Sequence, residues 1–166
     1  MPARILLVDD EEDVLDAWQE NLKPLKHVIV RARNEAEAVA AANEHPFDLV
    51  IVDYLMPLKT GVEVVAVIRK KLPLIRSILI SGRFDEKLSS AELRDTIRGR
   101  VEVDEYLHKP VKPKILRETV TRLLEGSPSI DWKAFAERSQ KARSITNQDT
   151  DAANKDLARH LKPKKN

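Results

Sequence analysis

Five short apolar runs alternate with five longer segments, and this alternation limits the folds open to the chain. The runs lie at residues 4–8, 28–32, 48–52, 77–80 and 105–108. The segments that follow them show helical spacing of apolar residues, most clearly at 12–23, 35–44 and 113–125 and more weakly at 90–97. Such alternation predicts a parallel sheet with helices on both faces, because each right-handed crossover needs a helix. The run at 49–52, the richest in apolar residues, should be the central strand.

Several residues mark where the predicted helices begin and end. Asn34 is suited to the N-cap of the second helix, and His45 with Pro46 closes it. Pro73 ends a third helix, whose inward face carries Val62, Val65 and Ile68. Pro113 is suited to the first turn of the last helix, and Gly126 to its C-cap. The pattern is therefore (βα)5.

Composition narrows the class of protein. The chain has 166 residues and is 42% hydrophobic, which is enough for one ordinary domain and an appendage. It has no cysteine, so disulfides, thiol nucleophiles and cysteine-bound zinc are excluded. No segment approaches the roughly 18 apolar residues of a membrane span, and the N-terminal residues show no secretory pattern. We therefore expect a cytoplasmic protein without membrane contact.

Polar residues that could bind ligands or take part in a reaction follow four of the apolar runs. Asp9 and Asp10 follow the first run, Asp53 the third and Ser81 the fourth, while Lys109 follows the fifth. In open α/β sheets ligands bind at the carboxyl ends of the strands. We therefore expect these five side chains to form one site.

Three clustered carboxylates have a predictable electrostatic requirement. Each close pair repels by roughly 4 kcal/mol at an effective dielectric of 20, so the cluster needs a cation. Oxygen ligands from carboxylates, a backbone carbonyl and water suit Mg²⁺. Taken singly, each residue has a plainer interpretation: an acid pair often caps a helix, and serine and lysine are common in loops. Their joint placement at strand ends favours the functional interpretation.

A wider set of motifs identifies a family. Besides the residues at the strand ends, the set comprises Met56 and Pro57 behind Asp53, Gly61, Gly82 after Ser81, Tyr106, and Pro110 after Lys109. Over residues 3–125 the chain resembles the receiver domains of two-component response regulators, the CheY-like group. The resemblance implies a flavodoxin-like, doubly wound sheet with strand order 2-1-3-4-5.

The same resemblance implies a role for each site residue. Asp53 would accept a phosphoryl group from a histidine kinase or a histidine phosphotransfer protein. Asp10, Asp53 and the backbone carbonyl of Leu55 would bind Mg²⁺ directly, and Asp9 through water. Lys109 and Ser81 would contact the phosphoryl oxygens.

The resemblance also concerns the residues around Lys109 and the region that transmits the signal. Tyr106 would be the switch aromatic, and Pro110 would follow a cis peptide bond. The segment between Ser81 and Lys109 is several residues longer than in most receivers, so the resemblance does not predict the geometry of the signalling face. Leu55 and Arg83 would influence how fast the phosphoryl group is hydrolysed, in a direction that the sequence does not predict.

Residues 127–166 form a C-terminal extension to the expected receiver domain at 1–126. The extension holds nine lysines and arginines against five acids. Trp132, Phe135 and Ile145 belong to a helical pattern there, followed by a polar, basic tail that we expect to be disordered. The helix either packs on its own receiver or engages a second subunit or a downstream protein. A few lysines without a fold predict only weak, non-specific nucleic-acid binding.

Two functions of different class remain open, together with one enzymatic alternative. The first is a phosphorylation-controlled receiver that signals by protein contact and catalyses only its own phosphorylation and dephosphorylation. The second is an interaction module on the same fold that works without phosphorylation, through the C-terminal helix; intact Asp53 and Lys109 disfavour it. The third is a hydrolase of the haloacid-dehalogenase type, which needs a second acid where Leu55 stands.

Overall fold

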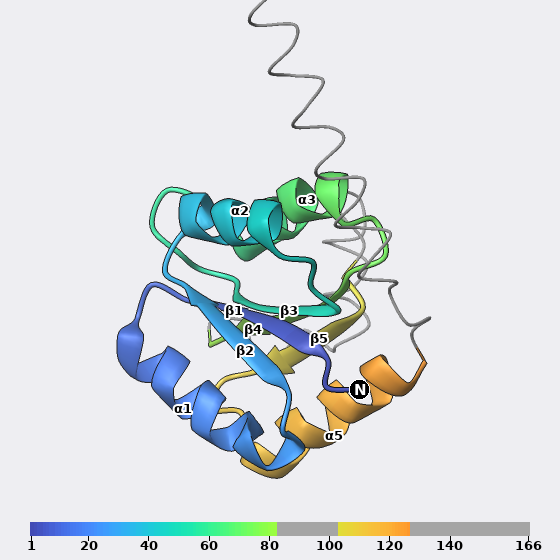
Figure 1. Ribbon diagram of the computed structural model, residues 1–166. Coiled ribbons are helices and arrows are strands. Elements are labelled where there is room, and N and C mark those ends of the chain that lie inside the picture. Colours follow the sequence, from blue (N-terminus) through green and yellow to red (C-terminus); the bar gives the residue numbers. More distant parts are fainter. Residues whose placement is uncertain (83–102, 127–166) are drawn as a thin grey trace, which may run out of the picture. The chain divides into compact units, whose positions relative to one another are not determined.

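Five parallel strands form a single sheet in the order β2-β1-β3-β4-β5. The computed structural model describes residues 1–82 and 103–126 (Figure 1). The strands are β1 (Arg4–Val8), β2 (Val28–Ala32), β3 (Leu49–Asp53), β4 (Arg76–Ser81) and β5 (Glu105–His108). This confirms the predicted strand order and the central place of β3, all five of whose residues are buried.

Helices cover both faces of this sheet. They are α1 (Glu12–Leu22), followed by the short 3-10 helix η1 (Lys23–Leu25), then α2 (Glu35–Glu44), α3 (Gly61–Lys71) and α5 (Pro113–Glu125). Figure 1 shows α2 and α3 side by side on one face and α1 and α5 on the other. None of the described helices is long and apolar enough to cross a membrane.

Local sequence signals account for most helix boundaries. The Asn34 side chain accepts a hydrogen bond from the Glu37 backbone N–H at 2.9 Å, so Asn34 caps α2 as predicted. Pro113 occupies the first turn of α5, and Gly126 is its C-cap. Gly126 has a φ of −84°, however, so this cap does not use the left-handed conformation that glycine usually provides.

The observed strands differ by a residue or so from those expected. β3 extends to Asp53 and β4 runs from Arg76 to Ser81 because main-chain pairing continues past the last apolar side chain. Asp53 is in register with Ile80, and the Lys109 N–H donates to the Ser81 carbonyl at 2.9 Å. The predicted helix at 90–97 and the extension at 127–166 lie outside the described residues.

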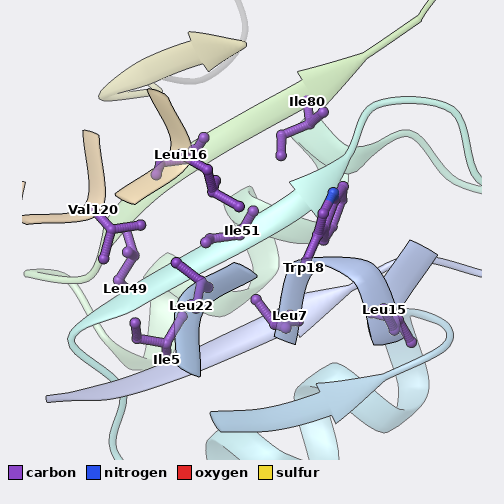
Figure 2. Packing of buried hydrophobic residues seen from close by; sticks show 11 residues of the cluster. Ile5, Leu7, Leu15, Trp18, Leu22, Leu49, Ile51, Ile80, Leu116 and Val120 are labelled. Carbon is purple, nitrogen blue, oxygen red and sulfur yellow. The ribbon is translucent and has the colours of Figure 1, made fainter. Parts of the chain in front are cut away.

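Apolar side chains from alternate strand positions fill the space between the sheet and α1 and α5. Figure 2 shows this cluster, in which Trp18 and Leu22 from α1 and Leu116 and Val120 from α5 meet side chains of β1, β3 and β4. Leu6, Val50 and Leu79 occupy the intervening positions and are also fully buried, so they face α2 and α3. Packing on both faces therefore fixes where the carboxyl ends of the strands lie in the fold.

Candidate functional site

The carboxyl ends of β1, β3, β4 and β5 bring the predicted polar residues to one edge of the sheet. Asp9 follows β1, Asp53 and Ser81 end β3 and β4, and Lys109 follows β5. Main-chain bonds fix these ends: the Asp9 N–H donates to the Ala32 carbonyl at 3.2 Å. The parallel ladder therefore sets the spacing between the side chains.

Lys109 joins two buried carboxylates. Its Nζ lies 2.7 Å from Asp53 Oδ1 and 3.1 Å from Asp9 Oδ2. Asp9 is fully buried and Asp53 is only 5% exposed. One ammonium thus pairs with two carboxylates, so the three side chains together carry one formal negative charge when both acids are ionised.

Burial and the neighbouring charges shift the pKa values of Asp9 and Lys109. Burial raises the pKa of Asp9 above its ordinary value, and the nearby Asp53 charge acts in the same direction. The hydrogen bond from the Glu11 N–H and the charge of Lys109 lower this pKa, but they offset the increase only in part. Burial by itself would lower the pKa of Lys109, but its hydrogen bonds and charge contacts with Asp53 and Asp9 outweigh burial and raise it. Lys109 therefore remains an ammonium, and ionised Asp9 is costly to bury.

Asp10 lies at the edge of this arrangement. It is half-buried, and it takes no part in the ion pairs of Lys109. Nor does it cap α1: the N-cap is Glu11, whose side chain makes no capping bond, while Asp9 Oδ1 accepts from the Glu11 N–H at 2.9 Å. The plainer interpretation of the acid pair as a helix cap thus fails for Asp10.

Ser81 and Tyr106 lie on the neighbouring strands β4 and β5. Ser81 is fully buried, and Tyr106 is 6% exposed, so the aromatic ring is inside the protein. Tyr106 is paired in register with Leu79, two residues before Ser81. The Lys109–Pro110 peptide bond is cis, as the resemblance implied.

The loop between β3 and α3 explains why a glycine stands at position 61. A Cβ there would lie 2.2 Å from the Asp53 carbonyl oxygen and 2.8 Å from Leu79 Cδ1, so no larger residue fits without movement. The Gly61 N–H also donates to the Tyr54 carbonyl at 2.9 Å. Leu55 is 43% exposed and pairs through its main chain with Thr60. This loop holds the end of β3 against the start of α3.

The side chains are of the types that bind a cation through oxygen, but they are not arranged around a common point. Across residues 1–82 and 103–126, no three histidine, aspartate or glutamate side chains are grouped so as to hold a metal ion. Two of the predicted acids share Lys109 instead. A cation beside Asp9 would offset the burial that raises the pKa of this carboxyl. The donor set, carboxylates with a backbone carbonyl nearby, suits Mg²⁺.

Two features of the site were not predicted from the sequence. The Lys109 ammonium lies 5.6 Å from the centre of the Trp18 ring, a contact that the helical spacing at 12–23 does not predict. Thr60 and Glu63 form a capping box at the start of α3. The Thr-x-x-Glu pattern could have revealed the second feature, whereas nothing local links Trp18 to Lys109.

Comparison with known proteins decides the family. The model of the response regulator receiver domain matches residues 5–121. The chain belongs to this family. Receiver domains of this kind are generally non-enzymatic signalling modules of two-component systems and are typically Mg²⁺-dependent.

Curated relatives are longer proteins that share the receiver. The chain is 27% identical over 139 residues to the alkaline phosphatase synthesis transcriptional regulatory protein PhoP of Bacillus subtilis, covering 80% of this chain and 55% of that protein. It is 31% identical over 121 residues to the transcriptional regulatory protein PrrA of Mycobacterium tuberculosis, covering 72% and 48%. The chain thus spans about half the length of these relatives.

Solved structures agree with the receiver fold. The signal receiver domain of an HD domain-containing protein from Pseudomonas fluorescens is 30% identical, with a TM-score of 0.67, covering 75% of this chain and 96% of that one. The receiver domain of NtrX from Brucella abortus is 28% identical, with a TM-score of 0.64, covering 74% and 99%. The flavodoxin-like sheet of CheY-like receivers is therefore the fold formed by residues 1–82 and 103–126.

Proposed function

We propose that this receiver accepts a phosphoryl group on Asp53 and signals through protein contact. The observation that supports the proposal most is the position of Lys109, which bridges buried Asp53 and Asp9 at the carboxyl edge of the sheet. The donor would be a phosphohistidine of a histidine kinase or of a phosphotransfer protein. The signal would then pass by contact to a downstream protein.

The transfer itself uses one nucleophile and one leaving group. An Asp53 carboxylate oxygen attacks phosphorus, the bond from phosphorus to the donor imidazole nitrogen breaks, and its electron pair stays on that nitrogen. The new bond is an acyl phosphate. Lys109 keeps its charge beside Asp53 and so stabilises the negative charge on the phosphoryl oxygens.

Binding of Mg²⁺ would supply charge neutralisation for both the acids and the phosphoryl group. Asp10, Asp53 and the carbonyl of Leu55 are the proposed direct ligands, with Asp9 acting through water. Asp9 is suited to an outer role because it is fully buried and holds Lys109 and the Glu11 N–H. Exposed Leu55, by contrast, lies in the loop that directly follows Asp53.

Ser81 and Tyr106 are proposed to respond to the phosphorylation of Asp53. The Ser81 hydroxyl would donate to a phosphoryl oxygen, and movement of Ser81 would change the space available to Tyr106. Both residues are buried on adjacent strands, so we expect a shift of Ser81 to affect the packing of Tyr106. Residues 1–126 would form the receiver, with 127–166 as a separate extension, in a cytoplasmic protein.

A phosphorylation-independent interaction module remains the second candidate. It would use the same fold and the C-terminal helix, and it would not need the close contact between Lys109 and Asp53. The hydrolase alternative is disfavoured because Leu55 supplies no second acid beside Asp53. The two remaining candidates differ in one measurable property, phosphorylation.

Intact-mass spectrometry distinguishes them. With Mg²⁺ and acetyl phosphate, the full chain should gain the mass of one phosphate, and Asp53→Asn should gain none. Asp13→Asn, which changes an exposed acid on α1, is the matched control and should be modified normally. An unmodified wild-type chain would leave the interaction module as the better account.

A further inference from the structure

The aromatic ring of Trp18 borders the site through its contact with Lys109. The ammonium lies 5.6 Å from the ring centre, within the range in which a cation is attracted to an aromatic face. Trp18 is 4% exposed and comes from the inner side of α1. Figure 2 shows its ring near the C-terminal end of β3, while Leu49 and Val120 lie toward the other end of the cluster.

Within the described part of the chain, the Lys109 ammonium lies beside two carboxylates and one uncharged group, the Trp18 ring. Two N–H groups face Asp9 and Asp53 at 3.1 and 2.7 Å. The Lys109 side chain is 27% exposed, so the ring also removes part of it from water. A leucine at position 18 would fill the core between α1 and the sheet but would not attract a cation.

We propose that Trp18 is a positioning residue for Lys109: its ring holds the ammonium at the strand ends while that ammonium exchanges a carboxylate for the phosphoryl group on Asp53. The inference rests on the proposed function, because only phosphorylation requires this exchange. A carboxylate binds the ammonium along fixed hydrogen-bond directions, whereas the ring face attracts it over a broad area. The ring can therefore retain Lys109 as its partners change.

Phosphorylation kinetics test this role in the full chain. With Mg²⁺ and acetyl phosphate, Trp18→Leu should slow the modification by about three- to tenfold, and Trp18→Phe should restore most of the rate because it keeps a ring. In a Lys109→Met background, Trp18→Leu should cause no further loss, since the residue it positions is gone. Leu22→Val is the matched control: it reduces packing on the same face of α1 but should not change the rate.

Fluorescence tests the contact itself without requiring phosphorylation. In a Trp132→Phe chain, Trp18 is the remaining tryptophan. Lys109→Met should then change the emission, whereas Lys114→Met, which removes an exposed lysine on α5, should not. If wild-type protein is not phosphorylated but Lys109→Met alters the emission, the proposed function fails while the contact stands.

Three results would overturn the positioning role. One is a Trp18→Leu chain that is phosphorylated at the wild-type rate. Another is an equal loss of rate from Trp18→Leu with and without Lys109. The third is Trp18 emission that does not respond to Lys109→Met. If Trp18→Leu does not fold, Trp18→Phe and the emission of the Trp132→Phe chain still decide the matter.

Discussion

Lys109 connects the electrostatics of the site to its chemistry. It holds Asp9 and Asp53 close together, yet one positive charge does not balance two buried negative charges. Burial is the main cause of the raised pKa of Asp9, and the charge of Asp53 adds to it. Asp9 therefore costs the protein stability when it is ionised and no further cation is bound.

Removing the charge at position 9 should stabilise the metal-free protein near neutral pH. Because the pKa of Asp9 is raised in the folded state, its contribution to stability is fully present below about pH 3.8 and is lost as the pH rises through the folded value. Asp9→Asn keeps an acceptor for the Glu11 N–H, and Asp53 still pairs with Lys109. Thermal unfolding should show a Tm gain for Asp9→Asn at pH 7 that shrinks toward pH 4. A Tm gain that does not depend on pH would show that the ionisation of Asp9 is not the cause of the stabilisation.

Two substitutions separate the metal ligands from the phosphoryl contacts. Asp10→Asn should abolish Mg²⁺ binding, because it removes a proposed direct ligand. Ser81→Ala should leave Mg²⁺ affinity nearly intact, because the hydroxyl serves the phosphoryl group. Calorimetric titration with Mg²⁺ measures both, and equal losses in the two variants would mean that the roles are misassigned.

At the scale of elements, the junction of β3 and α3 positions Asp53. The Thr60 side chain accepts from the Glu63 N–H, and the Glu63 side chain accepts from the Thr60 N–H at 2.8 Å. Gly61 lets α3 begin in contact with the last residue of β3. The start of α3 thus holds the main chain around Asp53.

Loss of this capping box should cost measurable stability. Thr60→Ala removes the acceptor at the helix N-terminus and should lower the free energy of unfolding by about 1 kcal/mol. Thr60→Ser retains the hydroxyl and should remain close to wild type. Denaturant unfolding of the three proteins provides the measurement, and an equal loss in both variants would rule out the cap as the cause.

Local patterns predicted the elements because their signals lie within a few residues of one another. Asn34 and Pro113 marked helix starts, and apolar runs located all five strands. The strand ends were less well predicted, since Asp53 and Ser81 join the ladder through main-chain pairing that side chains do not reveal.

The sequence predicted that three of the candidate side chains lie together, but it did not predict the contacts around them. The rule that parallel strands end at one edge brought Asp9, Asp53 and Lys109 together correctly. The reason for Gly61 depends on its distance from Asp53 and Leu79, and the Trp18 contact joins α1 to the residue after β5. Such contacts depend on packing between helices and sheet, which no local spacing encodes.

At the scale of the whole molecule, the question is what the extension adds to the receiver. Helices α1 and α5 cover one face of the sheet and α2 and α3 the other (Figure 1). Among residues 1–82 and 103–126, this arrangement leaves no obvious face of the sheet for the helix predicted near Trp132 to fill. We therefore expect that helix to act between molecules, in a homodimer or with a downstream protein.

Truncation after Gly126 tests this expectation. The 1–126 fragment should unfold at nearly the same temperature as the full chain, because no core residue of the receiver is removed. Sedimentation with and without phosphodonor should show whether the full chain associates and the fragment does not. A large drop in Tm with an unchanged monomeric mass would show instead that the helix packs on its own receiver, where each buried aromatic contributes a few kcal/mol.

The central claim is that Asp53 carries the phosphoryl group, and chemical trapping tests it most directly. After treatment with Mg²⁺ and acetyl phosphate, borohydride reduces an aspartyl phosphate to homoserine, which peptide mass spectrometry locates. We predict homoserine at position 53 and at no other acid of the site, with none in Asp53→Asn or without phosphodonor. Trapping at Asp9 or Asp10, or no trapping in wild-type protein, would contradict the account.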